Sequence, residues 1–183
     1  LGGIANVSYQ ELGATKAFDV CPCYLILNAF AQKKGLAYDD GGKLAASGKV
    51  NPDLLAELNA LNFYNLKPRP SLGIEIIEFV FLPVLEKFLI PVEDVLCTFC
   101  HHIAAQLAEV IAGEKEVLVT GGGAYNSYLI SCFKELGLVV FLPDNEVIEF
   151  KEAVVFAFLA LRKMEGKVNV LKSVTGATED SVS

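Results

Sequence analysis

Asp19 is the residue of this chain whose position best suits acid–base chemistry. It follows an apolar run in the stretch KAFDVCPC, residues 16 to 23, and so ends a strand-like segment at a sheet edge, where α/β ligands collect. A carboxylate there can take a proton from water or from a hydroxyl within hydrogen-bond reach. Asp19 could instead cap a helix that begins near Pro22, and spacing alone slightly favours the cap. The two roles are compatible, so the sequence leaves both open.

Two glycine turns could bring backbone N–H groups close to a ligand. The run at 121–123 follows a strand-like segment and precedes a helix, where N–H groups can point at anionic oxygens. It is not a P-loop, since no Lys-Ser/Thr pair follows, and it does not fit G-x-G-x-x-G, since position 126 is Asn. A tight turn that binds nothing explains the run equally well. Gly2 and Gly3 lie beside another strand, so the two turns could hold different parts of one nucleotide.

Four of the five cysteines, Cys21, Cys23, Cys97 and Cys100, are interpreted as packing residues. Cys21 and Cys23 flank Pro22, and the neighbouring Asp19 carboxylate would raise a thiol pKa rather than lower it. The stretch CTFCHH, residues 97 to 102, matches the C-x-x-C-H pattern of haem attachment and could hold zinc, but it lies within an amphipathic helix and has no second ligand pair. We therefore expect no bound metal on these residues, and reduced thiols in a cytoplasmic protein.

Composition narrows the classes of ligand. The chain has 183 residues, of which 53% are hydrophobic, enough for one domain with a real core. Its formal net charge is −7 without a block of like charges, so no nucleic-acid partner and no anionic-membrane surface is expected. An anionic substrate must then be met locally, by backbone N–H groups or a bound cation, and Mg-nucleotide would suit such a protein. Apolar runs such as FVFLPVL are cut by proline, so none reaches the roughly 20 residues of a bilayer span, and we expect a soluble protein.

The elements that must position these residues follow an α/β order with a mostly buried sheet. A β-hairpin with strands at 4–9 and 16–20 opens the chain. Asn51, ahead of Pro52, is a candidate N-cap. The expected helices are at 24–34, 43–46, 53–61, 74–88, 93–112, 126–136 and 150–163, and the expected later strands are at 116–120 and 138–143. The polar tail is expected to fray.

The start of the chain indicates that it is part of something longer. Leu1 lies in the middle of what reads as a strand and turn, the only methionine is Met164, and no signal segment opens the sequence. We therefore expect these residues to be a piece of a larger protein.

Six stretches in register over nearly the whole chain resemble anhydro-N-acetylmuramic acid kinase, specifically its C-terminal half. Each stretch alone is weak, but their order and spacing agree. They are LGGIANVS (1 to 8), FD with P three positions on (18 to 22), YDDGGKLAASGKVN (38 to 51), TGGGAYN (120 to 126), EAVVFAFLA (152 to 160) and SVTGA (173 to 177).

The resemblance implies an actin-like ATPase fold of the hexokinase and heat-shock-protein-70 superfamily, with two lobes of RNase H-like topology and ATP between them. Residues 1–177 would form the C-terminal lobe, an α/β unit with a mixed sheet that opens with a β-hairpin and carries helices packed on it, and 178–183 a polar tail. The N-terminal lobe would be missing from this chain. Alone, the chain is then expected neither to bind ATP tightly nor to turn over. Family members often pair into homodimers, for which the apolar helix at 74–88 could serve, although core packing explains it equally well.

The family reaction uses ATP, Mg²⁺ and water to open the 1,6-anhydro bridge of anhydro-N-acetylmuramic acid and to phosphorylate O6, in peptidoglycan recycling. Matching the family's motifs implies that Asp19 is the base that activates the attacking water. Glu152 would hold the sugar, although its place at the head of a helix has a plain explanation in the helix dipole. The nucleotide-binding residues implied are Gly2, Gly3, Asn6, Gly121, Gly122, Gly123 and Asn126.

The chain departs from the family's pattern after Asp19. Where the family commonly has D-T-G-P-G-N, this chain has D-V-C-P-C-Y, which puts bulkier side chains near the expected site. The usual K-S-T-G-R-E segment appears as PSLGIE, residues 70 to 75, and it leaves open whether Arg69 substitutes for a lost cation. A non-catalytic actin-like module that binds nucleotide or a partner is therefore the alternative. A stand-alone dinucleotide-binding domain is disfavoured by the missing third glycine and by the opening hairpin.

Overall fold

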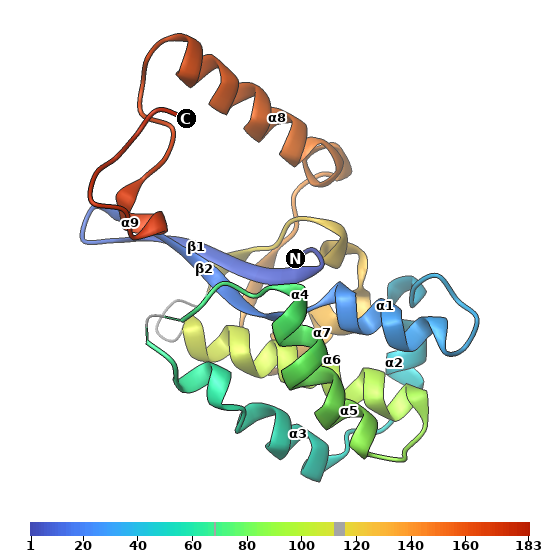
Figure 1. Ribbon diagram of the computed structural model, residues 1–183. Coiled ribbons are helices and arrows are strands. Elements are labelled where there is room, and N and C mark those ends of the chain that lie inside the picture. Colours follow the sequence, from blue (N-terminus) through green and yellow to red (C-terminus); the bar gives the residue numbers. More distant parts are fainter. Residues whose placement is uncertain (68, 112–115) are drawn as a thin grey trace.

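The opening hairpin consists of β1 (Ile4–Glu11) and β2 (Ala14–Pro22) in a computed structural model that describes residues 1–67, 69–111 and 116–183 (Figure 1). Leu12 and Gly13 form the two-residue turn, and both have positive φ, 49° and 80°. Two positive φ angles match the twist of the flanking strands, and glycine adopts such an angle without strain. The predicted hairpin is confirmed, with β1 longer than expected at its end and β2 longer at both ends.

A layer of helices covers one face of this hairpin, and its centre is α6 (Val92–Val110), of which more than half of the residues are buried (Figure 1). The predicted helix at 93–112 is thus confirmed within two residues. Around α6 lie α1 (Tyr24–Gln32), η1 (Asp40–Gly42), α2 (Lys43–Ser47), α3 (Pro52–Asn59), η2 (Asn62–Asn65), α4 (Ile74–Ile76), the π-helical turn η3 (Ile77–Phe81) and α5 (Leu82–Lys87).

Local signals explain where several of these helices begin or change. Asn51 caps α3 as predicted, because its side-chain oxygen accepts a hydrogen bond from the Leu54 amide at 2.9 Å. The expected helix at 74–88 is not uniform, since a π-helical turn occupies Ile77–Phe81 directly before α5. Pro83 lies in the first turn of α5 and has no amide hydrogen to donate, which breaks the regular α-helical ladder there.

A second, smaller sheet is formed by β3 (Glu116–Leu118) and β4 (Val139–Phe141), which pair in parallel. They are joined by η4 (Gly122–Tyr125) and α7 (Ser127–Glu135), so the predicted alternation of strand and helix is confirmed. The architecture is therefore mixed α/β with helices packed on small sheets. The expected single mixed sheet is not seen among the described residues: the antiparallel pair and the parallel pair are separate, and a cavity lies between β1 and β3.

Helix α8 (Asn145–Met164) of the C-terminal segment stands away from the rest of the molecule, and the chain then returns to the hairpin (Figure 1). The helix begins five residues earlier than expected and has only Ile148 buried. Short helix α9 (Lys172–Thr175) follows, near the hairpin. The expectation that the tail frays is wrong, because the backbones of Val170 and Ser181 bond to one another in both directions.

Within the described ranges, no helix is both long enough and apolar enough to cross a membrane.

Candidate functional site

The second glycine turn is shaped by its contact with the first residue. A Cβ at Gly121 would lie 2.6 Å from the Leu1 carbonyl oxygen, and one at Gly123 would lie 2.3 Å from the Leu1 Cβ. The Gly123 amide also donates to the Leu1 carbonyl at 3.0 Å. Close packing of backbone therefore requires glycine at both positions. Gly122 differs, because nothing lies within 4 Å of the place where its Cβ would be.

The first glycine turn holds the chain where β2 ends and α1 begins. The Gly3 carbonyl accepts hydrogen bonds from the Cys23 amide at 2.9 Å and the Leu25 amide at 3.2 Å, and the Gly2 carbonyl accepts one from Tyr24 at 3.2 Å. Since Leu1 packs on the turn at 121–123, the two glycine turns lie together.

Asp19 lies opposite Asn6 in the hairpin register. It is half-buried, and its Oδ2 accepts a hydrogen bond from the Leu72 amide at 3.0 Å. This bond brings the stretch at 70–75 beside Asp19, which the sequence alone did not predict. The predicted capping role is wrong, because α1 has Cys23 at its N-cap and no side-chain capping bond.

Three of the four departures after Asp19 are part of the core, and the fourth, Tyr24, is partly buried and packs against it. Val20, Cys21 and Cys23 are each fully buried. Burial raises the pKa of Cys21, and burial likewise raises the pKa of Cys23 to about 12. Both thiols are therefore protonated near neutral pH and lie within the core, which confirms their interpretation as packing residues.

Asn126 supports the turn from within the fold. Only 3% of it is exposed, and its Oδ1 accepts the Leu129 amide hydrogen bond at 2.9 Å, capping α7. A Cβ at Gly42 would lie 2.1 Å from the same Oδ1, so glycine is required there. The segments at 38–51 and 120–126, which resemble the family, thus meet at Asn126.

The CTFCHH stretch forms a buried network that the sequence did not reveal. His102 is fully buried; its Nδ1 lies 2.7 Å from Asn59 Oδ1, and its Nε2 lies 2.7 Å from the Tyr64 hydroxyl. Burial lowers the His102 pKa to about 3, so the ring is neutral, donates through Nδ1 and accepts from Tyr64. The only sign of this network in the sequence was that His102, a polar residue, lies between the apolar positions Phe99 and Ile103. In the described part of the chain, no group of three or more His, Cys, Asp or Glu could hold a metal ion.

A cavity of about 910 Å³ lies between β1 and β3, and its lining includes Asn6 and Thr120. A residue that the sequence did not single out also lines it: Lys151 of α8, whose Nζ donates to Thr120 Oγ1 at 2.8 Å. Thr120 directly precedes the second glycine turn. The cavity therefore brings together β1, the residue that precedes the glycine turn, and α8, whereas Gly121, Gly122 and Gly123 themselves are not part of its lining.

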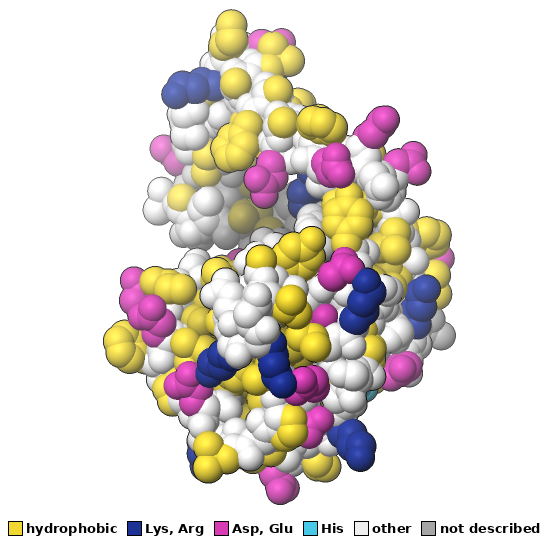
Figure 2. All heavy atoms as spheres, turned by 90° about the vertical axis from the view of Figure 1, so that its right-hand side faces the viewer, with side chains coloured by type: hydrophobic (Ala, Val, Ile, Leu, Met, Phe, Trp, Pro, Cys, Tyr) yellow, Lys and Arg dark blue, Asp and Glu magenta, His cyan; other side chains and the backbone are white. Residues whose placement is uncertain are grey.

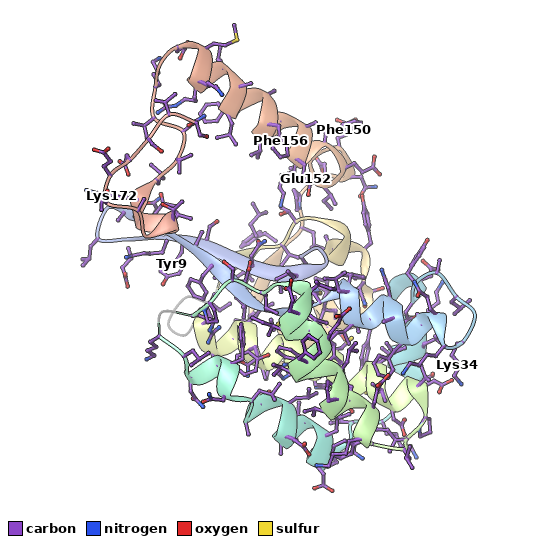
Figure 3. All side chains as sticks on the ribbon, viewed as in Figure 1. Tyr9, Lys34, Phe150, Glu152, Phe156 and Lys172 are labelled. Atoms are coloured by element: carbon purple, nitrogen blue, oxygen red, sulfur yellow. The ribbon has the colours of Figure 1, made fainter. Side chains whose placement is uncertain are left out.

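Glu152 lies next to Lys151 in sequence but is exposed (Figure 3). Glu152 was expected to lie at the head of its helix, but α8 begins at Asn145, and the acidic residue of its first turn is Glu146. The helix-dipole explanation for Glu152 is therefore wrong. In the described residues Glu152 has no ion-pair partner.

The chain is similar over its whole length to one family of known proteins. The family model described as anhydro-N-acetylmuramic acid kinase matches residues 1–183. Curated proteins of that name are similar: one from Shewanella sp. (strain W3-18-1), 34% identical over 100% of this chain and 53% of its own length; one from Nitrosospira multiformis, 35% identical over 97% and 51%; and one from Pseudomonas syringae pv. tomato, 34% identical over 97% and 52%. The chain spans about half the length of the curated relatives it matches.

Proposed function

Since the chain belongs to the anhydro-N-acetylmuramic acid kinase family, we propose that it forms one lobe of an ATP-dependent sugar kinase. The proposed reaction opens the 1,6-anhydro bridge of anhydro-N-acetylmuramic acid and phosphorylates O6, as a step of peptidoglycan recycling in the cytoplasm. The whole-chain family match carries this proposal. The missing N-terminal lobe accounts for the other half of the relatives' length, and the RNase H-like topology belongs to the same proposal.

In the proposed mechanism Asp19 acts as the general base. Its Oδ2 is fixed by the Leu72 amide, and its other oxygen has no hydrogen-bond partner among the described residues. That oxygen takes a proton from water while the water oxygen bonds to C1 of the sugar and the C1–O6 bond breaks. O6 then bonds to the γ-phosphorus as ADP leaves. Holding the carboxylate in one orientation contributes to the rate because the reacting groups meet in the required geometry.

The residues present fit a nucleotide at the glycine turns in part. The space around Gly122 is open, whereas Gly121 and Gly123 pack on Leu1 and serve the fold. Gly2, Gly3 and Asn6 border the same region, because Leu1 joins the two turns. ATP would supply the phosphoryl group there, and Mg²⁺ would neutralise its charge. We assign the other phosphate-binding loop and most of the Mg²⁺ ligands to the missing lobe.

The buried side chains after Asp19 favour the enzyme over the non-catalytic module. Val20, Cys21 and Cys23 fill the core, so the bulk of these three side chains does not narrow the approach to Asp19, whereas Tyr24 is only partly buried. Glu152 is exposed in the first half of α8 and is proposed as the sugar-binding residue (Figure 3).

The test compares Asp19→Asn with wild type in the full-length protein, supplied with ATP and anhydro-N-acetylmuramic acid. Formation of the 6-phosphate sugar is followed by mass spectrometry. We expect turnover in wild type and a loss of about 100-fold or more in Asp19→Asn, typical of removing a general base. Asp53→Asn is the matched control, because Asp53 is an exposed carboxylate of α3.

Equal turnover in wild type and Asp19→Asn would contradict the role of Asp19. Absence of turnover in both proteins, with nucleotide still bound, would support the non-catalytic module instead.

A further inference from the structure

We propose that Lys151 binds a phosphate group of the nucleotide, an inference that rests on the proposed function and adds a residue to it. Lys151 lines the cavity between β1 and β3 together with Asn6 and Thr120. Its Nζ lies 2.8 Å from Thr120 Oγ1, the residue joined by a peptide bond to Gly121. The ammonium group is thereby placed at the start of the second glycine turn.

The charge of Lys151 is not neutralised by a carboxylate within the described ranges. The ion pairs found there use Lys33, Lys34, Lys43, Lys87 and Lys167 instead. Two carboxylates, Glu11 and Glu116, also line the cavity. Glu116 lies four residues before Thr120, roughly 13 Å along an extended chain, and Glu11 lies at the far end of β1. In a chain of net charge −7, a cation without a close counter-charge suits an anionic ligand.

Backbone donors of the turn add to this cation. Within residues 1–67, 69–111 and 116–183 neither the Gly121 amide nor the Gly122 amide has an acceptor, whereas the Gly123 amide is bonded to Leu1. The surroundings of Gly122 are open to a ligand. Phosphate oxygens accept hydrogen bonds from backbone N–H groups of such turns, and a lysine ammonium adds a point charge. The two amides and Lys151 together provide donors of both kinds.

A purely structural role for Lys151 makes a different prediction. The bond to Thr120 also fixes the first half of α8, a helix in which only Ile148 is buried. If that were its whole role, removing the Thr120 hydroxyl would have the same effect as removing the charge. If Lys151 binds phosphate, the charge matters more than the hydroxyl.

The test measures binding of MgATP and of adenosine to the full-length protein by calorimetry. Lys151→Met is expected to weaken MgATP binding about 10- to 100-fold, the value of a charged hydrogen bond, and to leave adenosine binding unchanged. Lys151→Arg is expected to retain most of the affinity, and Thr120→Val to lose less than Lys151→Met does. Lys163→Met, an exposed lysine of the same helix, is the matched control.

The outcomes separate the two proposals. MgATP affinity equal to wild type in Lys151→Met, with turnover retained, would overturn the role of Lys151 alone. Equal weakening of MgATP and adenosine would also overturn it, because it indicates a displaced helix. A wild-type protein that binds no MgATP would overturn both the nucleotide site and the kinase proposal.

Discussion

Helices α6 and α8 are nearly equal in length, 19 and 20 residues, but lie in opposite environments. Helix α6 is surrounded by α1, α2, α3, α7 and the hairpin, whereas α8 stands apart and is largely exposed (Figures 1 and 2). The exposed fractions of Phe156 and Phe158 of α8 are 69% and 57%, while Phe99 of α6 is completely buried.

The difference lies in how the apolar residues are distributed. In α6 they form a face that neighbouring elements cover, so these side chains are shielded from water. In α8, apolar residues such as Val154, Phe156 and Phe158 follow one another at alternate positions, which places them on opposite sides of the helix. A helix that is apolar all round is typical of an enclosed position. Packing around α6 therefore provides most of the folding stability of these 183 residues, and α8 contributes little to that stability.

The strongest test of this comparison is a matched pair of phenylalanine truncations. Phe99→Ala is expected to lower the free energy of unfolding by about 3–5 kcal/mol, because it leaves a cavity in the core. Phe156→Ala should change it by less than about 0.5 kcal/mol, because the ring is mostly in water. Urea unfolding of the chain measures both. A large loss of unfolding free energy in Phe156→Ala would contradict the contrast between the two helices, since it would show that α8 is covered in solution.

The pH dependence of stability tests the burial of His102, a residue of α6. The unfolded His102 has an ordinary pKa of about 6.5, whereas burial lowers the folded value to about 3. The unfolded state therefore binds a proton first as the pH falls below 6.5, and stability is lost from there down to about pH 3. The loss due to His102 is about 2 kcal/mol at pH 5 relative to pH 7.5.

Urea unfolding at pH 7.5 and at pH 5 measures this loss. His101→Gln is the control, because His101 is only half-buried, and this variant should keep the pH dependence. In His102→Gln the same difference should largely disappear. Equal stability of wild type at both pH values would contradict the lowered pKa.

Much of the fold was predictable because its signals are local. The alternation around Gly13 predicted the hairpin, Asn51 before Pro52 predicted the start of α3, and the apolar stripe predicted α6. The start of α8 was placed too late because residues 145–149 include polar and charged side chains that resemble a loop. The separation of the two sheets depends on distances between β1 and β3, which no local pattern encodes.

The candidate site was predictable only in outline. The sequence suggested that the two glycine turns could hold parts of one nucleotide, and the contact of Leu1 with Gly123 brings the two turns together in the fold. Sequence patterns did not reveal the bond of Asp19 to Leu72 or that of Lys151 to Thr120, because each joins segments more than 30 residues apart. The chemical roles of the site residues remain predictions.

The smallest expected effects on stability come from substitutions at the N-terminal caps of two helices, α7, which contacts α6, and α8. Asn126 caps α7 through its bond to the Leu129 amide, so Asn126→Ala should cost about 1 kcal/mol of unfolding free energy. Asp144 occupies the same position before α8 but makes no side-chain capping bond, and Asp144→Ala should stay within about 0.5 kcal/mol of wild type. Urea unfolding resolves this difference if both variants are measured beside wild type. A cost for Asp144→Ala equal to that for Asn126→Ala would mean that α8 is as firmly built into the folded chain as α7, because a cap contributes to global stability only when its helix unfolds together with the core.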